Sequence, residues 1–542
     1  MRNRQIDTIE RVLLGLLFLI MLATIGINYH VAHHVLDDDA ASEIMLSEVL
    51  HREKRLVSDD FYYSTEFFVQ NQLIFGFLFN FFDGWANVRF VGTFIIQVLY
   101  LASYIYMMSQ SGAGRKTVLM SAILIMLPFT VVYGRTILYH CYYVCNFTAT
   151  YVILGLFFSF FKRPDAAKGS KIFRFILLMV VSFLSCFLYV RQLFLTMIPA
   201  AACLFFYLLA SHGEDRDPVR LRKWMLLPLL MTGAGAAGML CNSHFLIPSL
   251  NLYPQTDQNL GFLSPADWGP MLGALLIQFG YRVRVKLFSF IGILSLGGLF
   301  NCYVLLRQSI EDLKDSQFED FRAYMLRTML AVTLLFNLVI FIFGDIPFRL
   351  QADYSRYLVP VSIWIIPLLC LQYEAKDRLP FFKKIIWLIC GAVFVLNGLV
   401  NGKSFLDSGN FGQPYDGISY DNPHLADDLR SAADFIRAHD YRCGYAFAGE
   451  ANTLTELLNG FPVVSLRRTL DGVWQYANWL TLKSYKEIET DRAFLLVTKD
   501  DLELFEKSLE GLDTERIYFD DKGYVIYDIS HLDQFREMIR EP

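Results

Sequence analysis

Three consecutive aspartates, Asp37, Asp38 and Asp39, follow the first apolar segment of the chain. A helix is predicted directly after them, because apolar residues recur at helical spacing as far as about Lys54. One acidic side chain can cap that helix, and the helix dipole favours negative charge at its start. A cap needs only one carboxylate, however, and three like charges repel one another. Clustered carboxylates can also act as a general base or hold a divalent cation, so capping and catalysis both stay open.

Histidines near this acidic cluster raise the question of a metal site. His33 and Asp37 are four residues apart and would share a helical face, and His30 or His34 would supply a further ligand. An interfacial polar cluster is the commoner role for such residues. We therefore expect no cofactor, with a divalent cation at Asp37 and His33 as the alternative.

The chain that positions these residues has the composition of a membrane protein. Of the 542 residues, 54% are hydrophobic and 15% aromatic, which is more apolar surface than a water-soluble core could enclose. The net charge of −5 gives no sign of a nucleic-acid partner. Eleven apolar runs approach the length needed to cross a bilayer: 12–31, 88–108, 117–134, 138–161, 172–190, 192–210, 224–248, 286–306, 328–344, 357–373 and 385–401.

Basic residues set the expected orientation. If 67–82 does not span, the first eleven residues and the loops on their side carry 21 Lys and Arg, and the opposite short loops carry six. This positive-inside pattern places the N-terminus in the cytoplasm. Segment 67–82 is short and holds four amide side chains, so we expect an interfacial helix there. The loop 30–66 and residues 402–542 then face outward.

Arginines are unexpectedly frequent in the outward short loops. A lipid phosphate would need cations at that depth, and the planar guanidinium suits phosphate oxygens. Snorkelling to bulk phospholipids is the alternative explanation for each of them. The residues concerned are Arg135, Arg191, Arg282, Arg284, Arg349 and Arg356.

The first 400 residues resemble the GT-C membrane glycosyltransferases. The resemblance rests on Asp38-Asp39-Ala40 after the first span, the helix that follows, the Phe-Tyr-Tyr-Ser-Thr-Glu run at 61–66, and the Tyr-Ser-Arg-Tyr-Leu-Val-Pro run at 354–360. The family usually has one acidic pair, whereas this chain has three aspartates. Alignment to Asp-Asp-Ala favours Asp38 as the catalytic residue, with Asp39 and Asp37 as the other candidates.

The resemblance implies transfer of a sugar from a polyprenyl-phosphate donor to an acceptor on the outer face of the bacterial cytoplasmic membrane. The acceptor would be a cell-envelope glycan, lipid or protein. The outer-loop aspartate would take the proton from the acceptor hydroxyl, in a reaction that we expect to invert the anomeric centre. The matching stretches and the outer arginines supply the expected substrate-binding residues Tyr63, Glu66, Arg135, Arg191, Arg349, Arg356 and Tyr357.

Two other functional classes fit the same architecture. A lipid-carrier flippase or polysaccharide exporter would need a continuous polar path through the helices, yet no charged residue lies near the centre of any predicted span. A non-catalytic glycan-binding membrane protein would leave the three aspartates dispensable.

The composition changes sharply after residue 401. We expect a linker over 402–423, rich in Gly, Asp and Pro, and an extracytoplasmic α/β domain over 424–542. Helices are predicted at 424–439, 451–459, 500–509 and 531–540, and strands at 444–448, 463–466, 493–498, 516–519 and 524–528. Trp474, Tyr476 and Trp479 could stack on a sugar, although an aromatic core is the commoner role.

Overall fold

The structure is a computed structural model. It describes residues 7–63, 70–129, 133–134, 136–140, 143–162, 167–189, 192–210, 218–250, 264–267, 381–408, 425–468, 473–499 and 514–541, with isolated residues between 307 and 371 and at 502. The chain divides into two compact units. The first comprises Met1–Ile27, Ile96–Phe245 and Thr256–Tyr420, and the second comprises Asn28–Ile95, Leu246–Gln255 and Asp421–Pro542.

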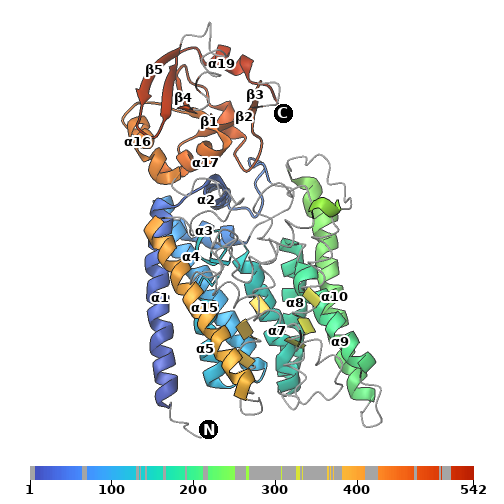
Figure 1. The fold of residues 1–542 in the computed structure, drawn as a ribbon. Coiled ribbons are helices and arrows are strands. Elements are labelled where there is room, and N and C mark those ends of the chain that lie inside the picture. The colour runs from blue at the N-terminus through green and yellow to red at the C-terminus, as the bar shows by residue number, and fades with distance from the viewer. Residues whose placement is uncertain are drawn as a thin grey trace. The chain divides into compact units, whose positions relative to one another are not determined.

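Long apolar helices form the described part of the first unit. They are α5 (Arg115–Ile125), α7 (Val144–Lys162), α8 (Lys168–Leu188), α9 (Ile198–Ala210), α10 (Pro218–Cys241) and α15 (Phe381–Ser408), with parts of α1 (Thr8–His34) and α4 (Trp85–Gln110), which continue into the second unit (Figure 1). Five described segments are long and apolar enough to cross a membrane: Thr8–His34, Trp85–Gln110, Val144–Lys162, Lys168–Leu188 and Leu226–Ser249. The chain is therefore a multi-pass helical membrane protein, as its composition predicted. The expected spans 286–306, 328–344 and 357–373 lie outside the described residues, apart from isolated positions.

Close packing between α8 and α10 depends on small residues in α10. A Cβ on Gly238 would lie 2.2 Å from the carbonyl oxygen of Phe183, so any larger residue would push the two helices apart. A Cβ on Gly235 would meet the sulfur of Met197 at 2.2 Å. The glycine-rich stretch of α10 therefore serves helix packing.

The second unit holds a six-stranded sheet with helices around it. Its elements are α2 (Asp38–Glu53), α3 (Asn71–Leu78), α16 (Leu425–Arg437), β1 (Gly444–Phe447), α17 (Ala448–Leu457), β2 (Val463–Arg468), β3 (Trp474–Tyr476), η8 (Ser484–Glu487), β4 (Ala493–Thr498), β5 (Thr514–Phe519), β6 (Tyr524–Ile529) and α19 (Leu532–Met538). The strand order is β3-β2-β1-β4-β6-β5. Strand β1 pairs in parallel with β2 and β4, and the remaining pairs are antiparallel. The α/β domain predicted from the sequence is confirmed.

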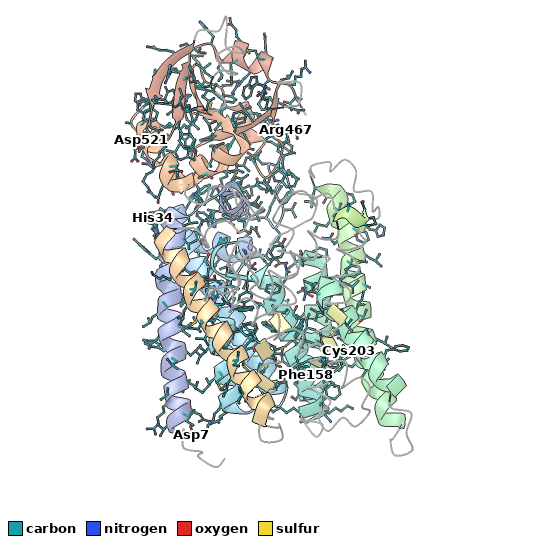
Figure 2. The ribbon with its side chains drawn as sticks, in the orientation of Figure 1. Asp7, His34, Phe158, Cys203, Arg467 and Asp521 are labelled. Atoms are coloured by element: carbon teal, nitrogen blue, oxygen red, sulfur yellow. The ribbon has the colours of Figure 1, made fainter. Side chains whose placement is uncertain are left out.

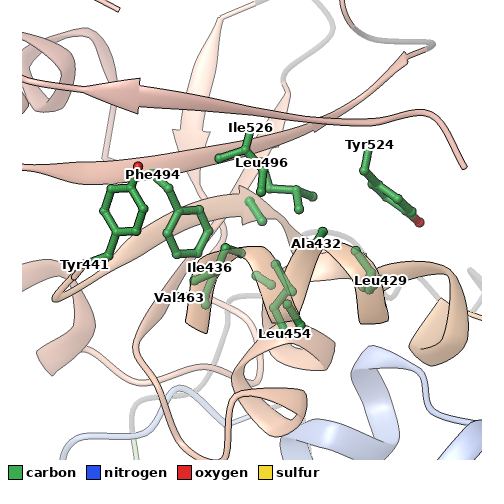
Figure 3. Packing of buried hydrophobic residues seen from close by; sticks show 13 residues of the cluster. Leu429, Ala432, Ile436, Tyr441, Leu454, Val463, Phe494, Leu496, Tyr524 and Ile526 are labelled. Carbon is green, nitrogen blue, oxygen red and sulfur yellow. The ribbon is translucent and has the colours of Figure 1, made fainter. Parts of the chain in front are cut away.

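The core of this domain lies between the sheet and helices α16 and α17 (Figure 3). Leu429, Ala432 and Ile436 form the buried stripe of α16 that the helical spacing predicted. They face Phe494 of β4, whose ring lies so close to Gly444 that a Cβ there would be 2.1 Å away. Glycine at 444 therefore lets the ring approach the backbone of the neighbouring strand.

Two boundaries differ from the sequence prediction. Helix α15 continues to Ser408, so the expected linker over 402–423 begins inside a helix, and 409–424 lie outside the described residues. The outer loop predicted as part of a transmembrane domain over 1–401 instead clusters with the C-terminal domain, as part of Asn28–Ile95. Within the expected helix 67–82, the structure has the eight-residue helix α3, and its interfacial position stays a prediction.

Candidate active site

The three aspartates lie at the N-terminus of α2, and the structure gives them different environments. Asp37 is the N-cap: its backbone is extended, and its Oδ1 accepts the amide hydrogen of Ala40 at 2.9 Å. Its side chain is buried, with only 3% of the residue exposed. Asp38 and Asp39 form the first turn of α2 and are half-buried. Capping therefore engages Asp37 and leaves the two following carboxylates as the more accessible acids.

A fourth acidic residue, Glu43, lies one helical turn after Asp39 on α2 and was not among the residues singled out from the sequence. It is buried, and Asn71 of α3 donates a hydrogen bond to its Oε1 at 3.5 Å. Burial raises the pKa of Glu43 to about 8. The positive charge of Arg89 lowers that pKa, while the charge of Asp39 raises it. Glu43 is therefore largely protonated at neutral pH.

Arg89 near the start of α4 joins the acidic helix to the α/β domain. It is 4% exposed, and its Nε donates to Oε1 of Glu456 on α17 at 2.9 Å. Its terminal nitrogen donates both to the second oxygen of Glu456 and, at 2.7 Å, to the carbonyl oxygen of Ala40. Burial raises the pKa of Glu456, and the Arg89 charge lowers it again. Arg89 thus bridges the carbonyl oxygen of Ala40 on α2 and the carboxylate of Glu456 on α17, and it holds the first turn of α2 against α17.

Sequence reasoning missed both Arg89 and Glu456. Arg89 is the second residue of a predicted span. An arginine at the end of an apolar run was therefore the sequence signal that could have marked it as a functional residue. Glu456 sits within an ordinary amphipathic helix, and no local pattern marks it. The pairing joins residues 367 positions apart, which no spacing rule reveals.

Hydrogen bonds and strand-like pairing join the segment after α2 to the α/β domain. The amide of Tyr62 donates to the carbonyl oxygen of Thr481 at 2.9 Å, and Asp60 accepts from both the amide and hydroxyl of Ser484. Tyr63 is 2% exposed, and its hydroxyl oxygen accepts the amide hydrogen of Ser58 at 2.9 Å. This hydrogen bond helps to hold the loop conformation, and the predicted substrate-binding role of Tyr63 stays a prediction.

The histidines at the end of α1 make local contacts. Nδ1 of His33 lies 2.8 Å from the carbonyl oxygen of Tyr29 and donates to it, and the two rings lie 4.3 Å apart. His34, labelled in Figure 2, pairs with Asp427 of α16 at 3.1 Å. Within the described ranges, no three His, Cys, Asp or Glu side chains are grouped to hold a metal ion. The divalent cation at Asp37 and His33 stays an untested alternative.

The other predicted substrate residues lie outside the described residues. They are Glu66, Arg135, Arg191, Arg349, Arg356 and Tyr357. The described site is therefore the acidic first turn of α2, with Glu43, Asn71, Arg89 and Glu456 holding it in place. Such a site offers half-buried carboxylates, positioned by buried polar contacts, that can accept a proton.

Comparison of structures relates this architecture to solved proteins, although no protein-family profile matches the chain and no curated sequence matches it. ArnT from Cupriavidus metallidurans bound to undecaprenyl phosphate superposes with a TM-score of 0.55 at 12% identity, over 95% of this chain and 97% of that one. The apo form of the same protein gives 0.54 at 11% identity, over 94% and 97%. An oligosaccharyltransferase from Archaeoglobus fulgidus, tethered to an acceptor peptide, gives 0.47 at 11% identity, over 96% and 74%, which is too low to carry an argument. The chain therefore has the GT-C fold that its motifs predicted.

Proposed function

We propose that the protein is a membrane glycosyltransferase that uses a polyprenyl-phosphate sugar and acts on a cell-envelope acceptor at the outer face of the membrane. The observation that carries this proposal is the acidic first turn of α2, held by Arg89 and Glu456, in a chain with the fold of ArnT. The ArnT crystal contains undecaprenyl phosphate, which supports a lipid-phosphate carrier for this chain as well.

In the proposed reaction, Asp38 accepts the proton of the acceptor hydroxyl, with Asp39 as the alternative base. The acceptor oxygen forms a bond to the anomeric carbon, and the bond from that carbon to the phosphate oxygen breaks. The electron pair stays on the departing polyprenyl phosphate. Attack from the face opposite the phosphate would invert the anomeric centre.

The leaving phosphate needs cationic partners, which the described part of the site does not supply, because Arg89 is engaged by Glu456. We assign that role to the outer-loop arginines Arg135, Arg191, Arg349 and Arg356, which the sequence places beside short outer loops.

The test is release of polyprenyl phosphate by the purified protein, offered a panel of polyprenyl-phosphate sugars with envelope acceptors. Asp38→Asn keeps the shape of the side chain and leaves the Asp37 cap in place, but it cannot take up the proton. We expect it to lower turnover by about two to four orders of magnitude. The matched control is Asp37→Asn, which retains the cap and should turn over almost normally. Near-normal turnover by folded Asp38→Asn would assign the base to Asp39.

A further inference from the structure

A pocket of about 320 Å³ opens within the second unit, away from the acidic first turn of α2. Its walls come from the later turns of α2, the start of α4, the turn between α17 and β2, and η8 with the residues that follow it. The volume is at the small end of the range for small-molecule sites, about 300–1,000 Å³. The lining residues are Glu48, Arg52, Trp85, Asn459, Gly460, Pro462, Ser484, Tyr485 and Ile488.

Hydrogen bonds between protein residues hold the walls of this pocket in place. Asn459 has a positive φ of 57°, its Oδ1 accepts the amide hydrogen of Trp85 at 3.0 Å, and its Nδ2 donates to the carbonyl oxygen of Asp83. Gly460 follows with a φ of 92°, and a Cβ there would lie 2.9 Å from the indole of Trp85. Ser484 is bound twice by Asp60. The pocket is therefore preformed, which lowers the entropic cost of binding.

Two charged side chains lie at this pocket and pair with each other. Arg52 and Glu48 are one helical turn apart on α2, with 3.5 Å between the guanidinium nitrogen and the carboxylate oxygen. The side chains are 56% and 26% exposed, so both keep hydrogen-bonding capacity toward a ligand. Burial raises the pKa of Glu48, and Arg52 offsets part of that effect.

The chemistry of the lining selects the ligand class. Paired opposite charges leave no net positive charge for a phosphate, and the polar side chains do not suit a hydrocarbon tail. Trp85 and Tyr485 are buried and form the rigid floor of the pocket, while Glu48, Arg52 and Asn459 present planar polar groups that can engage adjacent hydroxyls. A sugar ring carries adjacent hydroxyls along one edge, and that edge matches these planar polar groups.

We propose that this pocket binds one saccharide unit of the acceptor. The proposal rests on the proposed glycosyltransferase function and narrows its acceptor to a molecule that carries a glycan. The pocket and the acidic turn share helix α2, so one rigid element would carry both the bound glycan and the base. Acceptor recognition would then be separate from the chemistry of transfer.

The test measures saccharide binding directly, with the full-length protein in lipid nanodiscs on an array of bacterial envelope oligosaccharides. We expect binding to at least one class, and a loss of roughly tenfold or more in Glu48→Gln and in Arg52→Gln, because each removes a charge-assisted contact. The matched control is Arg55→Gln, which removes an exposed arginine whose pairing with Asp59 is also i,i+4 at 3.5 Å but lies outside the pocket. That variant should bind as the wild type does.

Two outcomes would overturn the proposal. One is no binding to any oligosaccharide on the array by protein that still unfolds cooperatively. The other is binding that survives both pocket variants. Failure of the proposed function is distinguishable, because Asp38→Asn should keep saccharide binding while transfer is lost. If wild-type protein binds glycan but releases no polyprenyl phosphate from any donor, the result supports saccharide binding in the pocket and contradicts the proposed glycosyltransferase activity.

Discussion

At the scale of single residues, the structure separates three aspartates that the sequence could only group. The motif predicted both a helix start and a candidate base, and the hydrogen bond from Ala40 to Asp37 shows which residue serves the first purpose. Spacing could not show this, because any of the three can cap until the end of the preceding helix is known. Glu43 and Asn71 escaped prediction for a related reason, since their importance comes from burial rather than from type or spacing.

The capping role of Asp37 leads to a stability prediction. Asp37→Ala removes the acceptor for the amide of Ala40, and we expect it to lower the free energy of unfolding by about 0.5–2 kcal/mol. Asp37→Asn should be nearly neutral, because asparagine caps as well as aspartate does. Thermal unfolding of the detergent-purified variants measures both. Equal destabilisation by Ala and Asn would mean that the charge of Asp37, rather than its hydrogen bond, stabilises α2.

Glu43 gives the protein a predicted pH dependence. Its pKa in the folded state is about 8, above the ordinary value of 4.5, so the folded protein holds a proton that the unfolded chain releases between those values. Stability due to this group is therefore present below about pH 4.5 and is lost as the pH rises toward 8. Glu43→Gln resembles the protonated acid and can still accept from Asn71. We expect it to be more stable than wild type at pH 8, by on the order of 2 kcal/mol.

Thermal unfolding from pH 5 to pH 8, followed by intrinsic fluorescence, checks this expectation. Glu515→Gln, at an exposed carboxylate of β5, is the control and should leave the pH profile unchanged. A Glu43→Gln profile parallel to that of wild type would show that Glu43 is ionised in the folded protein.

At the scale of elements, periodicity predicted well wherever a strand or helix buries one face. Helix α16 and strands β1, β4 and β6 appear within a few residues of their predicted bounds, because their apolar residues build one core. Strand β3 was missed, since three residues that pair with β2 at the sheet edge leave too short a pattern. Trp474 and Tyr476 of β3 are buried, which favours the core role over stacking on a sugar.

The contact between α4 and α17 carries the sharpest prediction at this scale. Replacing Arg89 by methionine alone, or Glu456 by leucine alone, leaves the partner as an uncompensated buried charge, and we expect a loss of about 3–5 kcal/mol in the free energy of unfolding. The double variant Arg89→Met/Glu456→Leu removes both charges and should recover most of that loss. The control is Arg437→Gln, which breaks an exposed pair with Asp434 and should cost roughly 0–1 kcal/mol.

Unfolding in denaturant measures this set of variants as a double-mutant cycle. Additive losses in the double variant would show that the two side chains stabilise the protein independently and that their bidentate contact adds nothing.

At the scale of the whole molecule, hydropathy predicted a membrane protein with an appended α/β domain, and both are observed. Hydropathy could not show that residues Asn28–Ile95, which include α2 and the start of α4, cluster with that domain. The association depends on specific contacts such as Trp85 with Asn459 and Asp60 with Ser484, which join residues 374 and 424 positions apart. The acidic turn is thus supported from the C-terminal domain, so the proposed catalytic residues and that domain must lie on the same side of the membrane.

The side on which the domain lies is the last prediction. Positive-inside counting places the domain outside and the basic loop before α8 in the cytoplasm. A cysteine at Asp521, exposed in the β5–β6 turn and labelled in Figure 2, should react with a membrane-impermeant maleimide in intact cells. A cysteine at the exposed Ala167 before α8 should react only after permeabilisation. The native Cys443 of the domain is buried, and unsubstituted protein supplies the background signal. Labelling at Ala167 with protection at Asp521 would invert the orientation, place the acidic turn in the cytoplasm and remove outer-face transfer as a function.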